Sequence, residues 1–177
     1  VTDEGLSDFD HVLRMLRLSV EDARKIIWDL RPAVLDGLGL SEAVGAIADR
    51  IAVEGPAEVL TQLAEIGRLN EGQSTAIYKI AREALLNAER HAGAAHIEVR
   101  LALEGECGSE IVRLLVQDDG RGFDAAGKRP RGHYGLTMME EQAAAVGGVL
   151  RIESHPGRGS TVELTLPLVR AVHEEGR

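Results

Sequence analysis

The sequence contains little cysteine and has no surplus of positive charge, and each deficiency excludes a class of protein. Its one cysteine, Cys107, has no partner for a disulfide within the chain, which favours a reducing compartment. The 20 basic residues are outnumbered by 29 acidic ones, which gives a net charge of −9. Because no basic block stands out either, we do not expect a nucleic-acid surface.

Long hydrophobic runs are also missing. No stretch approaches the roughly 20 apolar residues of a membrane span, and no signal-peptide pattern opens the chain. We therefore expect a cytoplasmic fragment that makes no membrane contact itself, and we leave open whether a longer parent is membrane-anchored. Aromatic residues make up only 3% of the 177 residues, so the core must be built from Leu, Ile, Val and Ala.

The N-terminal part predicts a helix that needs a partner. From Asp8 to Arg31 apolar residues recur at alternating steps of three and four, which is a heptad-like seam over about three heptads. Pro32 should end this helix, because the residue before a proline is pushed out of the α region. A dimerisation helix is the simplest interpretation of such a seam.

The rest of the chain is expected to mix helices and strands. The predicted elements are a turn at 32–40, a helix at 41–54, a strand at 57–64, a helix capped by Asn70 and closed by Gly93, strands at 96–103 and 111–117, a helix at 136–146, and a hairpin of strands at 149–153 and 161–166. Both faces of strand 111–117 carry apolar residues, so both are expected to be covered. Gly55 and Pro56 mark the predicted boundary between a helical segment, 1–54, and a domain, 55–170, with a tail at 171–177.

The helix that ends at Gly93 has two faces of different composition. One arc is apolar, whereas a second arc carries Lys79, Glu83, Asn87 and Arg90 at three- and four-residue spacing. An acid, an amide oxygen and a cation in successive turns can hold a hydrated Mg²⁺ and its phosphates, because Mg²⁺ prefers a few hard oxygen ligands. A solvated helix face with i,i+4 charge pairs would look similar. The stripe alone therefore decides nothing.

Nine of the 20 glycines lie between Gly120 and Gly159, in three clusters that each adjoin a regular element. The first cluster, DDGRGFD, follows a strand, so Asp118 should project from the strand's end. Gly120 and Gly122 would let the backbone approach a flat ligand. A carboxylate there can accept from the exocyclic amine of adenine, whereas guanine would present a carbonyl oxygen. An Asp-Gly hairpin turn is the ordinary alternative.

The other two clusters also suit a ligand. In GHYGLTMMEE the glycines precede a helix, where backbone N–H groups could hold a phosphate over Gly135 and Leu136. It is not a Walker loop, which ends in Gly-Lys-Ser/Thr. The third cluster, GRGSTVELTLP, precedes the strand predicted to begin at Thr161. The stretch 118–134 carries little apolar material and suits a mobile lid.

Together and in this order, the motifs closely resemble the four nucleotide-binding boxes of the histidine-kinase-like ATPases, a family shared with gyrase, Hsp90 and MutL. The boxes read E-x-x-x-N-x-x-R-H, then D-x-G-x-G-F after a strand, G-x-x-G-L before a helix, and G-x-G-S-T before the last strand, within residues 55–168. The resemblance implies an α/β sandwich, in which helices cover one face of a mixed β-sheet. It also implies ATP and Mg²⁺ as cofactors, with ATP held between a helix and the lid.

The resemblance assigns roles to individual residues. Asn87 would bind Mg²⁺, and Glu83 would orient or deprotonate the acceptor as the catalytic carboxylate. Arg90 and His91 would contact phosphate, and Asp118 would recognise adenine. The remaining expected ATP contacts are Gly120, Gly122, Gly135 and Leu136 around the pocket and lid, His133 beside the phosphate loop, and Thr161 at the adenine end.

The stretch WDLRPAVLDGLGLSEAV narrows the resemblance to sensor histidine kinases of the nitrate/nitrite-sensor subfamily. It implies a homodimer through the N-terminal helices, a response-regulator partner, and transfer of the γ-phosphoryl group of Mg-ATP to a histidine. In that family the acceptor histidine lies on an earlier helix and is followed by an acidic residue, whereas His11 is followed by Val12. We therefore expect a catalytic portion that lacks its acceptor histidine and does not phosphorylate itself alone.

Two alternatives remain at this point. An anti-sigma-factor-like serine kinase would share the fold, but the heptad-like helix and the DLRP junction argue against it. A nucleotide-sensing interaction module would bind ATP without transferring a phosphoryl group. Only an assay of transfer can separate this second alternative from a kinase.

Overall fold

The computed structural model describes residues 15, 32–67, 69–106, 109–125 and 134–168. The chain divides into two compact units, Val1–Pro32 and Ala33–Arg177. Apart from Met15, the predicted seam of 8–31 lies outside the described residues, as do His11, His133 and the tail 171–177. No helix among the described residues is long and apolar enough to cross a membrane.

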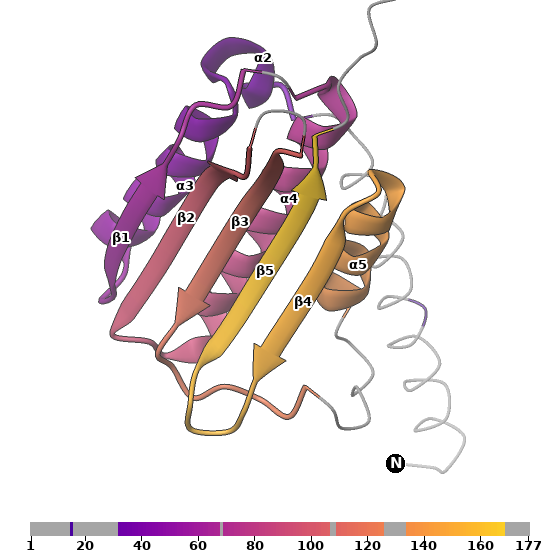
Figure 1. Cartoon of the computed structure of the whole chain (residues 1–177). Coiled ribbons are helices and arrows are strands. Elements are labelled where there is room, and N and C mark those ends of the chain that lie inside the picture. The colour runs from indigo at the N-terminus through magenta and orange to yellow at the C-terminus, as the bar shows by residue number, and fades with distance from the viewer. Residues whose placement is uncertain (1–14, 16–31, 68, 107–108, 126–133, 169–177) are drawn as a thin grey trace, which may run out of the picture. The chain divides into compact units, whose positions relative to one another are not determined.

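The second unit is built on a five-stranded mixed sheet (Figure 1). Its strands are β1 (Glu58–Leu63), β2 (His96–Glu104), β3 (Ile111–Asp118), β4 (Val149–Ser154) and β5 (Ser160–Pro167), in the order β1-β2-β3-β5-β4. β1 and β2 are parallel, whereas every other neighbouring pair is antiparallel. The predicted hairpin of the last two strands is present as β4 and β5.

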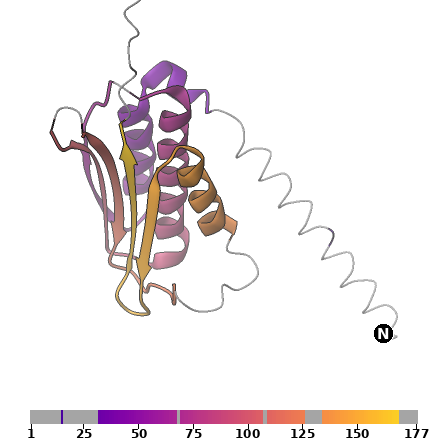
Figure 2. The ribbon, with the colours of Figure 1, turned by 45° about the vertical axis from the view of Figure 1, so that its right-hand side comes forward.

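Helices cover one face of this sheet (Figure 2). They are α2 (Val34–Leu38), α3 (Leu40–Glu54), α4 (Glu71–Asn87) with a π-helical turn η1 (Ala88–Ala92) after it, and α5 (Tyr134–Ala145). The crossover through α4 joins the parallel strands β1 and β2, as a parallel pair requires. The predicted fold class is confirmed, but α2 lies where a plain turn was predicted.

The N-terminus of α4 is fixed by its cap. Asn70 Oδ1 accepts from the Gln73 N–H at 2.9 Å, while Gln73 Oε1 accepts from the Asn70 N–H at 3.1 Å. This reciprocal capping box satisfies two of the helix's orphan donors, and it confirms Asn70 as the predicted cap. At the other end Gly93 adopts a left-handed conformation with φ of 61° after the π-turn.

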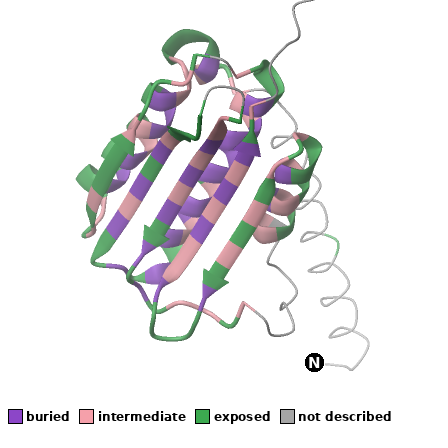
Figure 3. Cartoon of the chain, viewed as in Figure 1, coloured by how far each residue is buried: buried purple, intermediate pink, exposed green. Residues whose placement is uncertain are grey.

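The core lies between the helices and the sheet. Its largest fully buried side chains include Ile77, Ile80 and Leu85 of α4 and Leu114 of β3, and buried residues alternate along the central strands (Figure 3). The opposite face of β3 is only partly buried, contrary to the prediction that both faces are covered. Arg113 on that face pairs with glutamates of β2 and β5. The helices pack on one side only, so polar pairs take the other.

The boundary of the unit also differs from the prediction. It falls after Pro32 and not at Gly55, because α3 contributes to the same core. Its residues Val44 and Ile51 are 0% and 1% exposed. The Gly55 N–H donates to the Ile51 carbonyl at 2.9 Å. The Gly-Pro pair is therefore the turn between α3 and β1, and not a linker between domains.

Candidate functional site

The predicted polar arc is present in the C-terminal half of α4 and continues into η1. Glu83 and Asn87 are half-buried, while Arg90 and His91 are exposed on η1. Within the described part of the chain, these four side chains form no hydrogen bond or ion pair. Lys79 departs from the predicted stripe, because it is only 6% exposed. The i,i+4 charge ladder that would explain the stripe without a ligand is therefore not found among the described residues.

The π-turn η1 brings the end of this arc against the first glycine cluster. The Arg121 N–H donates to the Ala92 carbonyl at 2.9 Å. A Cβ at Gly120 would lie 2.5 Å from the same carbonyl oxygen, so only glycine fits there. Single π-turns within helices are frequent at functional sites. Here the turn places Arg90 and His91 beside the DDGRGF loop.

Asp118 ends β3 as a buried carboxylate. It is 8% exposed, and its Oδ1 accepts from the Gly120 N–H at 2.9 Å. Burial raises the pKa of Asp118 above its ordinary value, while hydrogen bonds from Gly120 and Ser160 oppose this shift. A buried acceptor that retains unused lone pairs is suited to the exocyclic amine of a base.

Ser160, and not Thr161, shares the side of the sheet on which this site lies. Ser160 pairs with Asp118 across the β3–β5 ladder. Thr161 projects from the opposite face, where it lines a shallow surface hollow with Arg151 and Glu163. The strand begins at Ser160, one residue earlier than predicted. The role of Thr161 at the adenine end, which came from the resemblance, stays a prediction that this orientation does not favour.

A buried serine that sequence reasoning missed connects two glycine clusters. The Ser154 hydroxyl accepts from the Phe123 N–H at 2.8 Å, donates to the Gly159 carbonyl at 2.9 Å and lies 3.0 Å from Ser160 Oγ. Gly122 has a φ of 57°, and a Cβ on it would lie 2.7 Å from the Gly159 carbonyl oxygen. The first and third clusters therefore interlock. No sequence signal identifies Ser154, since it is one serine among ordinary strand-end residues.

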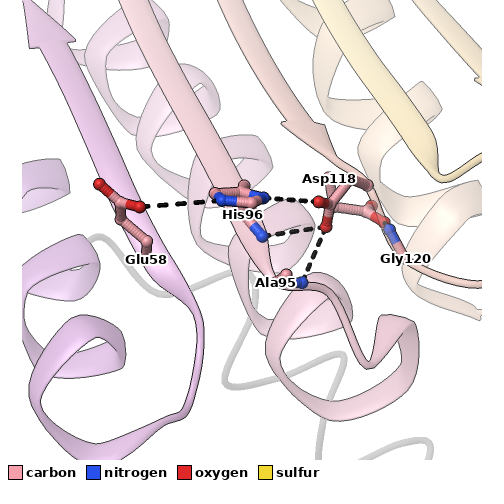
Figure 4. A network of polar contacts seen from close by, with 6 residues as sticks. Glu58, Ala95, His96, Asp118 and Gly120 are labelled. Atoms are coloured by element: carbon pink, nitrogen blue, oxygen red, sulfur yellow. Dashed lines mark hydrogen bonds and ion pairs between the residues drawn. The ribbon is translucent and has the colours of Figure 1, made fainter.

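Asp119 anchors the same loop to the start of β2 (Figure 4). Its carboxylate accepts from the Ala95 N–H at 2.8 Å, from the His96 N–H at 2.9 Å and lies 2.7 Å from His96 Nδ1. Hydrogen bonds from the His96 backbone and side chain lower the pKa of Asp119 to about 2. The Asp119 carboxylate in turn raises the pKa of His96, and Glu58, 3.8 Å from Nε2, adds to this effect. His96 is exposed, but it has partners.

The start of α5 lies against Glu83. A Cβ on Gly135 would overlap the Glu83 carboxylate, so any other residue there would require the Glu83 side chain to move. Leu136 follows and is half-buried. The structure thus brings together Glu83 with Gly135, and Asp118 with Gly120 and the β4–β5 turn, whereas Thr161 lies apart from both.

The oxygen donors present fit a magnesium ion that arrives with its nucleotide. The described part of the chain holds no group of three His, Cys, Asp or Glu side chains that could bind a metal by themselves. Mg²⁺ needs no such cage, because it keeps several waters and takes one or two protein oxygens plus phosphate oxygens. Glu83 and Asn87 stand one turn apart with unpaired oxygens among the described residues.

Comparison with known proteins agrees with this geometry. The model of the histidine kinase-, DNA gyrase B- and HSP90-like ATPases matches residues 72–170. The chain belongs to this ATPase family. Its matched part begins in α4 and extends past β5, so it includes all four motifs, and membership implies nucleotide binding.

Curated relatives of this ATPase domain are sensor kinases. The sensor histidine kinase MctS of Rhizobium johnstonii is 34% identical over 93% of this chain and 35% of its own length. The signal transduction histidine-protein kinase/phosphatase DegS of Brevibacillus brevis is 30% identical over 94% of this chain and 42% of its own length. The chain therefore spans less than half the length of these relatives.

Solved structures agree on the architecture. The blue-light activated histidine kinase EL346 of Erythrobacter litoralis superposes with a TM-score of 0.59 at 26% identity, over 73% of this chain and 42% of that one. The histidine kinase domain of the same protein gives a TM-score of 0.58 at 27% identity, over 73% of this chain and 61% of that one. The nitrate/nitrite-sensor subfamily is named by none of these comparisons and stays a prediction.

Proposed function

We propose that this ATPase domain is the catalytic portion of a two-component sensor histidine kinase, which transfers the γ-phosphoryl group of Mg-ATP to a histidine. The observation that carries the proposal is that the side chains of Glu83, Asn87, Arg90 and His91 have no partner among the described residues, near the buried carboxylate of Asp118. The sensor-kinase relatives support it. A response regulator as the downstream partner, and dimerisation through the N-terminal helices, are part of the same proposal.

Each residue has a distinct task in this proposal. Asp118 accepts from the adenine amine, and Ser160 orients that carboxylate. Glu83 holds the acceptor imidazole in line and takes its proton. Arg90 and His91 neutralise phosphate charge. Asn87 would hold the Mg²⁺, which supplies charge neutralisation between the phosphates when bound. Because phosphoryl transfer depends mainly on positioning and electrostatics, these side chains suffice without a covalent intermediate on the enzyme.

Binding can be tested on the chain as it is. Calorimetric titration should show Mg-ATP binding and no measurable GTP binding, because guanine presents an acceptor to Asp118. Asn87→Ala should weaken Mg-ATP much more than metal-free ATP in EDTA. An equal loss with and without metal would rule out Asn87 as the ligand while leaving the nucleotide site intact.

Transfer needs a separately made acceptor. The chain incubated with γ-labelled ATP should bind nucleotide yet stay unlabelled, because in-line transfer requires an acceptor held near the γ-phosphate. Addition of a dimerisation domain that carries an acceptor histidine should restore acid-labile labelling, and Glu83→Gln should abolish it. Binding without transfer to any acceptor would favour the nucleotide-sensing module. Stoichiometric label on His11 would show that the acceptor is present after all.

A further inference from the structure

Arg50 of α3 reaches across to the π-turn. Its guanidinium contacts the Glu89 carboxylate through two atoms, Nη1 to Oε1 at 3.0 Å and Nη2 to Oε2 at 3.2 Å. The same Nη1 donates to Glu54 on its own helix at 2.8 Å. The hydrogen bonds that Arg50 donates to Glu89 first, and then to Glu54, raise the pKa of Arg50. The Arg50–Glu89 pair therefore joins α3 to η1 through a planar fork.

The position of Glu89 gives this pair its importance. Glu89 is the second residue of η1, and Arg90 and His91 follow it directly. Among the described residues, Glu89 makes the only side-chain hydrogen bonds that join η1 to another element. The other tie is at the end of the turn, where the Ala92 carbonyl accepts from Arg121. η1 also continues α4, and its Ala88 and Ala92 are buried in the core. Beside Arg90 and His91, the Glu89 fork is the side-chain contact that can adjust their direction.

The pair is better suited to fix geometry than to add stability. The Arg50 and Glu89 side chains are 40% and 22% exposed, and ion pairs with this much solvent contribute little to folding. A two-point guanidinium–carboxylate contact nevertheless restricts orientation more than a single hydrogen bond does. Its loss should therefore change what η1 presents to a ligand more than it changes the melting temperature.

We propose that Arg50 is a positioning residue for the phosphate end of the nucleotide, acting through Glu89 on Arg90 and His91. The proposal rests on the proposed function, since it takes these two side chains as phosphate contacts. It makes phosphate affinity depend on the position of α3, whereas adenine recognition by Asp118 does not involve α3. A displacement of α3 would thereby change the affinity for ATP selectively.

The test compares nucleotides that share adenine but differ in phosphate. ATP and adenosine are titrated into the parent chain, Arg50→Gln and Glu89→Gln. Glu54→Gln is the matched control, because it removes the other ion pair of Arg50 and leaves the fork to Glu89. We expect the dissociation constant of ATP to rise about three- to tenfold in the two fork variants only. In the two fork variants, the affinity for adenosine and the melting temperature should equal those of the Glu54→Gln control.

Two further variants separate orientation from charge. Arg50→Lys keeps the charge but cannot form the fork, so it should lose part of the ATP affinity. The swap Arg50→Glu with Glu89→Arg should recover most of it, because the fork is rebuilt in reverse. A merely structural role for Arg50 would lower the affinity for ATP and adenosine together, and that result would overturn the proposal.

The inference and the proposed function fail in different ways. If the parent binds ATP, Asp118→Asn weakens it, and the fork variants match Glu54→Gln, only the positioning role of Arg50 is refuted. If the parent does not bind ATP at all, the proposed function falls and the role of Arg50 falls with it.

Discussion

Two regions of this domain use the same kinds of side chain in opposite ways. On the open face of the sheet, arginines are paired: Arg113 with Glu104 and Glu163, and Arg151 with Glu153. On α4 and η1, Glu83 and Arg90 have no partner within the described residues. In a chain of net charge −9, a cation that finds no carboxylate nearby is notable. The comparison supports the proposal that Glu83 and Arg90 serve a ligand.

The two regions also differ in how the fold affects the charges of their side chains. The hydrogen bonds that Arg113 donates to Glu104 and then to Glu163 raise the pKa of Arg113, so its charge is supported by the fold. Burial raises the pKa of Asp118, so its charge is opposed by the fold. The charge of Arg113, on the open face, is thus one that the fold stabilises. A polar group that destabilises the domain lies where the nucleotide is expected.

The largest expected effect is at Asp118. Asp118→Asn should weaken the binding of ATP at least about tenfold, since a charge-assisted hydrogen bond contributes about 1.5–3 kcal/mol. The same change should raise the melting temperature of the nucleotide-free domain at pH 7. An acid whose folded pKa is raised loses stability as pH rises through that pKa, and asparagine removes this ionisation.

Titration calorimetry and thermal melting of the two proteins check this prediction. A variant that binds ATP as the parent does would show that the carboxylate does not recognise adenine. A variant that melts lower than the parent would contradict the second half of the prediction, which is that the buried charge opposes folding.

The next effect distinguishes the two faces at adjacent residues. Ser160→Ala should weaken ATP about three- to tenfold, because it removes a hydrogen bond to the Asp118 carboxylate. Thr161→Val, one residue on, should leave ATP affinity unchanged, since Thr161 lies on the open face. Fluorescence or calorimetric titrations of both variants provide the check. The reverse order of effects would restore the original expectation for Thr161.

A smaller effect is expected on the open face itself. Arg113→Gln should lower the free energy of unfolding by about 1 kcal/mol or less, because exposed ion pairs contribute little. ATP affinity should not change. Urea unfolding measures the first quantity and calorimetry the second. A clear loss of nucleotide binding would mean that the open face is coupled to the site, and that the two regions do not act independently.

The smallest effect is a dependence of stability on pH at His96. Its pKa is raised by Asp119, so its contribution is fully present below about pH 6.5 and is lost as pH rises through the shifted value. The Asp119 pKa is lowered to about 2, so its contribution is present above about pH 4 and is lost as pH falls toward 2.

His96→Gln tests this pair, because it keeps the backbone contact with Asp119 while removing the titrating ring. Melting temperatures of parent and variant should converge above about pH 8 and differ most between about pH 4 and 6.5. Curves that stay parallel across this range would show that the His96 ring does not contribute.

Sequence patterns predicted the elements well where periodicity was long. α4 and the strands begin and end within a few residues of the prediction, because alternation and a capping box are local signals. α2 was missed, since five residues that include Gly37 give no readable period. The π-turn could not be predicted from the sequence, because a π-helical turn leaves the apolar composition of the segment unchanged. The domain boundary was misplaced because a Gly-Pro pair can mark a tight turn as well as a linker.

Only those residues of the site that belong to sequence motifs could be predicted. Glu83, Asn87 and Asp118 could be named from spacing and resemblance, and their roles remain predictions. Ser154 and the Arg50–Glu89 fork could not, because both depend on which segments the fold brings together. Thr161 was named from the resemblance, and the motif alone does not show which face of β5 it lies on.

The pairing of Asp118 with Ser160 has a consequence for how this domain can change in length. After Asp118 the chain leaves the sheet, passes through α5, re-enters the sheet as β4 at Val149, and reaches Ser160 through the β4–β5 turn. The entropy of closing such a loop grows only with the logarithm of its length, so doubling it costs roughly 0.6 kcal/mol. Insertions between β3 and α5 should therefore leave the register of the sheet untouched. The length of the lid can therefore change, by evolution or by design, without a change of the fold.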